Sequence, residues 1–407
     1  MKKALSLPMQ ILSALVAGIA IGLACNIAGM TSFATDYLKP FGDIFINLLQ
    51  FIVVPVVLFS MIEGIISMED MRKVGSVGMK TILYFLCTTA IACVIGLGAA
   101  SLFKTAGLFP VLDASGVTYE PDAYSGFMST LVNIFPTNIW QTFSEANMLQ
   151  VLIISLFFGG AIIAAGEKGK MCRELVSSIY AVIERMMHFI IALAPVGVFT
   201  YMAWVVATQG ADILGSLALV LLCAYVCYIV HAALVYTSAV RAIGKITPAT
   251  FFKGAAAAMM FAFTTSSSTA TLPVSRECAE KLGVDKEVSS FVLPLGATIN
   301  MDGTAIYQCV ATVFLASCAN MELTISQLAM IVVTATLASI GTAGITGAGM
   351  IMLVMVLETV GVPVSYIGLI IAVDRLFDMG RTCLNVTGDI SCAVCVNRWE
   401  KNSNAGK

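Results

Sequence analysis

Long apolar stretches recur along this sequence, and they restrict what it can fold into more than any other feature. A helix needs about 20 mostly apolar residues to cross the hydrocarbon of a bilayer, and runs of that length lie at 8–30, 41–66 and 78–103. Only 11% of the residues are charged, against about 25% in soluble domains. The sequence therefore predicts an all-α polytopic membrane protein. The net charge of −2 gives no electrostatic reason to expect nucleic acid as a partner.

The apolar runs change in character along the chain. Spans are also predicted at 147–165, which is short, and at 175–207 and 212–240, whereas the polar segment 104–146 is predicted to be a long loop. After residue 250, small and polar residues interrupt each apolar run. These interruptions lie in 256–275 around TTSSSTATLP, 288–318 around NMDGT, 326–361 around GTAGITGAG and 364–396 around DMGRT.

The distribution of basic residues predicts an orientation, because cytoplasmic loops of membrane proteins are enriched in Lys and Arg. With the N-terminus inside, the inner segments hold 17 of the 22 lysines and arginines, and the outer loops hold only Lys39 and Lys104. This bias requires the segments around 267 and 344 to enter and leave the membrane on the same side, as re-entrant hairpins. We therefore expect both termini in the cytoplasm, and the short loops favour the inner (plasma) membrane of a prokaryote.

A hairpin with a small, polar tip followed by an interrupted span occurs twice in the second half of the chain. Non-helical backbone survives at membrane depth only where protein buries it or where it lines a wet cavity. Small residues at such a tip allow backbone groups to approach a ligand closely. Paired interruptions in corresponding positions indicate the binding site of a transporter, so the layout predicts a transporter.

Several charged residues lie inside the predicted spans. A carboxylate or guanidinium at membrane depth costs roughly 2.5–3.5 kcal/mol on insertion scales, so such residues are candidates for a functional site. Asp302 lies in mid-span, and Arg375 and Arg381 lie in the last span. The alternative is that these charges only pair with one another to hold helices together. One stripe follows the spacing of a helical face and consists of Asp374, Asp378, Arg381, Asn385 and Asp389.

Other polar residues support weaker alternatives. His188 and His231 are isolated on apolar segments, where packing or a hydrogen bond between helices is favoured over a proton relay. The serines at 266–268 could suggest an intramembrane protease, but a serine nucleophile needs a base within hydrogen-bond distance. Both histidines lie on earlier segments. We therefore expect a protein that is not an enzyme.

Four motifs together resemble the signatures of the glutamate-transporter family, the dicarboxylate/amino acid:cation symporters. They are SSSTATLP (266–273), LGATINMDGTA (295–305), SIGTAGITGAGMIMLVMVL (339–357) and DMGRTCLNVTGD (378–389). The resemblance covers essentially the whole chain. It implies eight transmembrane helices and two re-entrant hairpins built as inverted repeats, assembled as a homotrimer in membrane lipid.

The resemblance also implies a division into a fixed scaffold and a mobile transport unit that carries substrate across the membrane as an elevator does. The scaffold would comprise 1–70 (spans one and two) and 105–208 (the outer loop with spans four and five). The transport unit would comprise 71–104 (span three) and 209–396 (span six, hairpin one, span seven, hairpin two and span eight). Residues 397–407 would form a cytoplasmic tail.

A substrate site is implied on the last span. By resemblance, Arg381 would hold the side-chain carboxylate of a small amino-acid substrate, Asp378 its amino group, and Ser268 of the first hairpin its main-chain carboxylate. A planar guanidinium facing a buried carboxylate is the pairing that geometry favours. The same pocket would be completed by Thr382, Asn385, Thr304 and Gly349.

Three sites for cotransported Na+ are implied as well. Carboxylates, amides and carbonyls are hard oxygen ligands, which suit an alkali cation better than a transition metal. The first site would use Asn385, Asp389, Asn300 and the Gly296 carbonyl, the second Asp302, Asn300, Thr88 and Thr89, and the third the backbone oxygens of Thr298, Ser339, Ile340 and Thr342.

These residues predict a sodium-driven symporter that imports aspartate or glutamate. Gln308 stands where eukaryotic members of the family have a proton-carrying glutamate, and a neutral amide cannot carry a proton. The alternatives keep the fold but change the cargo: a neutral amino acid, cystine or a C4-dicarboxylate, or coupling to protons. Arg381 argues against small neutral amino acids and Asp378 against a dicarboxylate without an amine, but Arg375 adds a guanidinium that alters the pocket rim.

Overall fold

The computed structural model of this protein describes residues 7–73, 76–111, 132, 135–145, 147–339, 348–371 and 373–405. All regular secondary structure in these residues is helical, which confirms the predicted all-α class. Five helical stretches are long and apolar enough to cross a membrane, judged by length and composition: Met9–Ile27, Thr31–Ile66, Ser76–Thr105, Ile153–Ala192 and Ile213–Ala242. Large apolar side chains such as Val16, Phe51 and Phe189 are exposed on them, as expected of surfaces that face lipid.

The first third of the chain follows the predicted spans closely. It forms α1 (Leu7–Ile27), α2 (Thr31–Phe33), the π-helical turn η1 (Ala34–Leu38), α3 (Lys39–Lys73) and α4 (Ser76–Thr105). The main difference is that α3 extends to Lys73, beyond the end of its apolar run.

The middle of the chain differs from the sequence-based expectation in two places. The segment predicted as a loop contains a short helix, α6 (Ile139–Ser144), because the Asn138 side chain caps it by accepting hydrogen bonds from the backbone N–H groups of Trp140 and Gln141. The predicted span 175–207 is divided between α8 and α9, because Pro195 in the first turn of α9 has no N–H to continue the preceding helix. The helices here are α7 (Met148–Ala165), η2 (Gly166–Gly169), α8 (Lys170–Ala192) and α9 (Ala194–Gln209).

The second half contains the interruptions that the sequence predicts. Ser266 has left-handed backbone angles (φ 52°, ψ 40°) between α12 and α13, which pack against each other. Asn300 and Met301 leave the helical conformation between α14 and α15. The helices α16 and α17 also pack together, and the tip between them lies outside the described residues. The bounds are α10 (Asp212–His231), η3 (Ala232–Tyr236), α11 (Thr237–Ala242), α12 (Pro248–Thr265), α13 (Ser268–Lys281), α14 (Lys286–Ile299), α15 (Asp302–Cys318), α16 (Ile325–Ser339), α17 (Ala348–Val360), η4 (Val364–Tyr366), α18 (Ile367–Ile371) and α19 (Asp374–Ala405).

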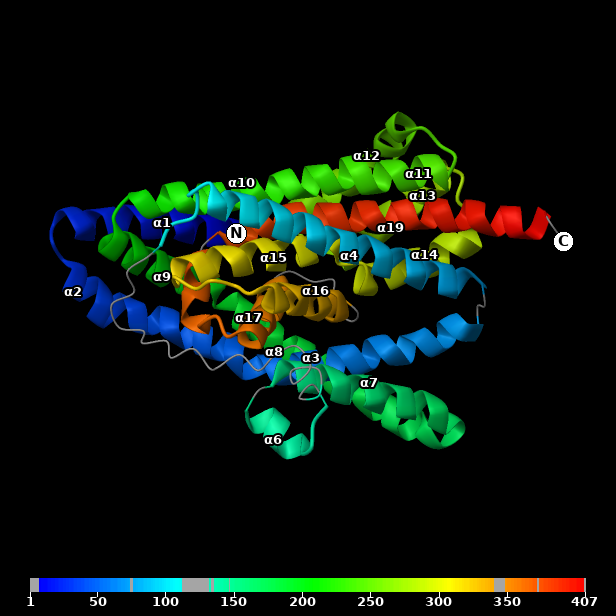
Figure 1. Ribbon diagram of the computed structural model, residues 1–407, viewed down its shortest axis with the longest axis horizontal. Coiled ribbons are helices and arrows are strands. Elements are labelled where there is room, and N and C mark those ends of the chain that lie inside the picture. Colours follow the sequence, from blue (N-terminus) through cyan, green and yellow to red (C-terminus); the bar gives the residue numbers. More distant parts are fainter. Residues whose placement is uncertain are drawn as a thin grey trace, which may run out of the picture.

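The polar last helix runs through the interior of the molecule. In Figure 1, α19 extends along the long axis between the α10–α11 side and the α15 side. It packs against α12, α13, α14 and α15, and also against α4 and α10. Its neighbour α15 is buried at every residue from Asp302 to Cys318. The charged residues of α19 between Asp374 and Asp389 are therefore enclosed by protein.

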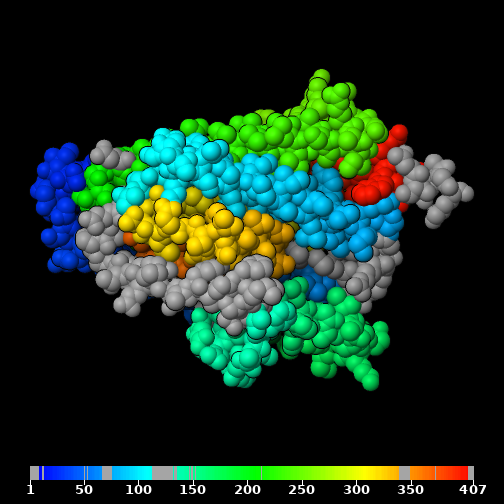
Figure 2. Space-filling model, in the orientation of Figure 1, coloured from blue at the N-terminus to red at the C-terminus, as the bar shows by residue number. Residues whose placement is uncertain are grey.

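A second group of helices packs mainly with itself. α1 packs against α9, and α3 packs against α7, α8 and α9. Figure 2 shows α6 and α7 projecting from one side of the molecule. The interruptions at 266 and 300 lie outside this second group, among the helices that pack around α19.

Candidate functional site

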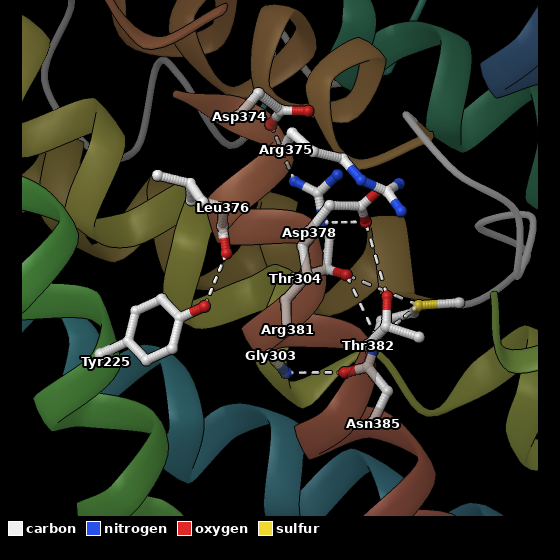
Figure 3. A network of polar contacts seen from close by, with 11 residues as sticks. Tyr225, Gly303, Thr304, Asp374, Arg375, Leu376, Asp378, Arg381, Thr382 and Asn385 are labelled. Atoms are coloured by element: carbon white, nitrogen blue, oxygen red, sulfur yellow. Dashed lines mark hydrogen bonds and ion pairs between the residues drawn. The ribbon is translucent and has the colours of Figure 1, made fainter. Parts of the chain in front are cut away.

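The polar stripe that the sequence predicts for the last span lies on one uninterrupted helix. Because α19 runs without a break from Asp374 to Ala405, residues spaced by three and four positions lie on the same face. Asp374, Asp378, Arg381 and Asn385 are all buried and form the network drawn in Figure 3. Tyr225 on α10 donates a hydrogen bond to the Leu376 carbonyl at 2.7 Å, which ties α10 to the same helix.

Arg381 is the centre of this network and is only 2% exposed. Its Nε donates to Asp378 Oδ1 at 2.9 Å and its Nη1 donates to Asp374 Oδ1 at 3.1 Å. The guanidinium lies over the ring of Tyr307, 4.6 Å from its centroid. Within the described residues Nη2 has no hydrogen-bond partner. A buried guanidinium with a spare N–H group can donate a hydrogen bond to a ligand oxygen. The contact with Tyr307 was not predicted from the sequence.

A second arginine contacts the same carboxylate. Arg375 is 4% exposed, and its Nη1 lies 3.6 Å from Asp378 Oδ2. Asp378 therefore lies between two guanidiniums. Two aspartates and two arginines balance in charge, as buried ionic groups must.

Two glycines let backbone approach Arg381 closely. A Cβ on Gly349 of α17 would lie 2.6 Å from Arg381 Nη1, and a Cβ on Gly303 of α15 would overlap the Arg381 backbone. A larger residue at Gly303 would push α15 away from the backbone of α19, and a larger residue at Gly349 would displace the Arg381 guanidinium. The start of α17 thus covers the Arg381 guanidinium.

The neutral residues predicted for the substrate site join this network with one exception. Thr382 Oγ1 lies 3.5 Å from Asp378 Oδ1, and Asn385 Nδ2 lies 3.4 Å from Thr304 Oγ1. Asn385 Oδ1 accepts a hydrogen bond from the Gly303 N–H at 2.7 Å. Ser268 is buried at the start of α13, but no hydrogen bond in the described part of the chain joins it to this group.

A carboxylate–amide group lies on the same helix, one turn beyond Asn385. Asn300, at the break between α14 and α15, donates through Nδ2 to Asp389 Oδ1 at 2.9 Å and to the Asn385 carbonyl at 2.8 Å. Gly296 packs on Asp389, where a Cβ would lie 2.7 Å from the carboxylate carbon. The buried Asn300 Oδ1 has no partner among the described residues. These are the residues of the first predicted cation site, and they present oxygens of the kind Na+ binds.

Asp302 is the centre of a separate buried group. Its Oδ1 accepts from Thr89 Oγ1 at 2.6 Å, and its Oδ2 accepts from Tyr236 Oη at 2.8 Å. His231 Nε2 lies 3.1 Å from the same Oδ2, and both His231 and Asp302 are 0% exposed. The histidine thus forms the bond between helices that the sequence favoured, although its partner was not predicted.

The other residues predicted as cation ligands do not form a comparable cluster in the described part of the chain. Thr88 Oγ1 bonds to the Phe85 carbonyl of its own helix at 3.1 Å. Thr298 is exposed, and its hydroxyl bonds to the Leu295 carbonyl at 2.9 Å. Ser339 ends α16. The third predicted site also involves Ile340 and Thr342, which lie outside the described residues.

The donors favour an alkali cation over a transition metal. In the part of the chain that the structure describes, no group of three or more His, Cys, Asp and Glu side chains is arranged to hold a metal ion. The candidate ligands around Asn300 are carboxylate, amide and backbone oxygens, which are hard ligands.

Comparison with known proteins assigns this architecture to one family. The model of the sodium:dicarboxylate symporter family matches residues 7–399. The chain is 35% identical to C4-dicarboxylate transport protein 1 of Ralstonia nicotianae, covering 97% of this chain and 92% of that protein. It is 32% identical to the proton/sodium-glutamate symport protein of Geobacillus stearothermophilus, covering 99% and 96%, and 35% identical to the C4-dicarboxylate transport protein of an Anaeromyxobacter species, covering 97% and 90%. This chain therefore belongs to the sodium:dicarboxylate symporter family, a family of membrane transporters.

Proposed function

We propose that this chain imports a small solute with two carboxylates, of the aspartate or glutamate class, driven by the sodium gradient. The observation that carries the proposal is the buried Arg381, which is held by Asp374 and Asp378 and whose Nη2 has no partner among the described residues. A substrate carboxylate would take this guanidinium from the aspartates through paired hydrogen bonds.

The other residues of the pocket would orient the substrate. Asp378 would receive the ammonium group once Arg381 has turned to the substrate carboxylate. Thr382, Asn385 and Thr304 would supply hydrogen bonds on the same side, and Ser268 would contribute from the start of α13. The start of α17 at Gly349 covers Arg381, so we infer that this helix must move before a substrate can enter.

Sodium would bind beside the substrate site. One ion would be held by Asn300 Oδ1, which has no partner among the described residues, together with Asp389, the Gly296 carbonyl and Asn385. A second would be held by Asp302 with Asn300, Thr88 and Thr89. The backbone oxygens of Thr298, Ser339, Ile340 and Thr342 would hold a third. Gln308 is buried on α15 as a neutral amide, which supports coupling to sodium rather than to protons, although the Geobacillus relative is named for both ions.

A C4-dicarboxylate is the second candidate substrate. Two relatives carry that substrate in their names. Within this chain, Arg375 supports it, because a second guanidinium at Asp378 favours a doubly negative ligand.

The transport mechanism would be an elevator. The packing of α1 and α3 with α7, α8 and α9 supports a scaffold of 1–70 and 105–208, and the packing around α19 supports a transport unit of 71–104 and 209–396. In this proposal the chain has eight transmembrane helices and two re-entrant hairpins and forms a homotrimer. It lies in the plasma membrane, with both termini in the cytoplasm.

Binding measurements on the purified protein test the coupling. The affinity for L-aspartate, measured by calorimetry, should rise steeply as Na+ replaces choline, and aspartate should in turn lower the Na+ concentration needed for half saturation, because linkage is reciprocal. With more than one ion per substrate, a tenfold rise in Na+ should raise the affinity by more than tenfold. Tight aspartate binding that is indifferent to Na+ would contradict the proposed sodium sites.

A further inference from the structure

Arg375 is a buried charge that the import of an acidic amino acid does not require. It lies three residues before Asp378 on α19, and its side chain is 4% exposed. Within the described residues, its Nε and Nη1 form no hydrogen bond. Its Nη1 lies 3.6 Å from Asp378 Oδ2, close enough for an ion pair. A buried guanidinium with so few hydrogen bonds is unfavourable unless a ligand or a paired charge compensates it.

The position of Arg375 affects the group that would recognise an amine. Asp378 Oδ1 accepts from Arg381 Nε at 2.9 Å, and Asp378 Oδ2 faces Arg375 Nη1. When a substrate carboxylate draws Arg381 away, Asp378 keeps Arg375 as a counter-charge. It therefore does not need an ammonium group to stay compensated.

The charged groups also share a common space. A cavity of about 20 Å³ borders Asp374, Arg375 and Asp378 together with Met350 of α17. That volume holds about one water molecule. Figure 3 shows the Arg375 side chain extending past Asp378 rather than away from the network. Its charge therefore acts on whatever ligand group reaches Asp378.

We propose that Arg375 is a specificity-determining residue that takes the place of a substrate ammonium at Asp378. The site then accepts four-carbon dicarboxylates without an amino group as well as acidic amino acids. The inference rests on the proposed function and adds to it the class of substrate. In this arrangement Asp378 does not exclude an amine-free substrate, because Arg375 already lies beside that carboxylate.

The charges of the two ligands determine how Arg375 affects their binding. Succinate carries two negative charges, whereas aspartate carries two negative charges and one positive charge. An added guanidinium next to the amine position attracts the first ligand and repels the ammonium of the second. Removing Arg375 should therefore weaken the binding of succinate relative to the binding of aspartate.

The test measures the inhibition constants of succinate and L-aspartate against sodium-driven uptake of a labelled dicarboxylate in proteoliposomes. In the wild type, the two constants should lie within about tenfold of each other, and Arg375→Gln should raise the succinate-to-aspartate ratio by about tenfold or more, since each factor of ten is about 1.4 kcal/mol. Arg375→Lys keeps the charge and should keep the ratio near that of the wild type. Arg398→Gln, on the exposed end of α19, is the matched control and should change nothing.

A double-mutant cycle identifies the route of the effect. In the Asp378→Asn background, Arg375→Gln should no longer change the ratio, because the two residues act through one contact. An unchanged ratio in Arg375→Gln would overturn the inference while leaving the proposed function intact. So would a wild type in which excess succinate does not compete, whether or not any variant folds. Absence of sodium-driven uptake of aspartate, glutamate and succinate alike would instead contradict the proposed function.

Discussion

Replacing Arg381 with lysine is expected to abolish uptake of both aspartate and C4-dicarboxylates while the protein remains folded. Lysine keeps the positive charge beside Asp374 and Asp378 but lacks the planar fork that pairs with a carboxylate. It also lacks the guanidinium plane that lies over Tyr307. A hydrogen bond to a charged group contributes about 1.5–3 kcal/mol, so loss of the paired bonds to the substrate carboxylate should lower the affinity by roughly two orders of magnitude or more.

Calorimetric titration of the purified Arg381→Lys variant with each substrate measures this loss. Arg398→Lys, an exposed arginine of the same helix, is the matched control and should bind as the wild type does. Thermal melting and a monodisperse elution profile should show that the Arg381 variant is folded. Near-native affinity in a folded Arg381→Lys variant would mean that the substrate carboxylate binds elsewhere.

Asp302→Asn is expected to raise the Na+ concentration for half-maximal uptake by about a hundredfold. A unit charge about 4 Å from a cation contributes about 4 kcal/mol at an effective dielectric constant of 20, and neighbouring donors offset part of this. The asparagine would keep the shape of the side chain in contact with Thr89, Tyr236 and His231. The substrate contacts at Arg381 should persist, so the apparent substrate affinity at saturating Na+ should change little.

Sodium titrations of uptake at fixed substrate concentration give the half-maximal value. Asp285→Asn provides the matched control, since that aspartate is exposed and pairs with Lys401 at the surface. Tyr236→Phe removes one hydrogen bond to Asp302 but keeps the carboxylate, so its shift should be much smaller than that of Asp302→Asn. A sodium dependence that Asp302→Asn leaves unchanged would remove this carboxylate from the cation sites.

Much of the site could be predicted because it follows local sequence spacing. The stripe from Asp374 to Asp389 depends only on the helical repeat, and α19 provides that repeat without a break. The interruptions at Ser266 and Asn300 were visible as small and polar residues within apolar runs, where membrane helices rarely tolerate them.

The parts that could not be predicted depend on contacts between distant segments. His231 and Tyr236 reach Asp302 across 71 and 66 positions, and both lie among apolar neighbours that resemble lipid-facing helix. The contact of Tyr307 with Arg381 likewise requires knowledge of how α15 packs on α19.

Uptake of radiolabelled L-aspartate into proteoliposomes tests the central claim most directly. An inward Na+ gradient should drive accumulation above equilibrium, unlabelled succinate and L-glutamate should compete, and L-serine should not. A proton gradient without Na+ should drive no accumulation. Accumulation driven by protons alone, or transport of serine with no uptake of aspartate or succinate, would contradict the assignment of Arg381 and the sodium sites.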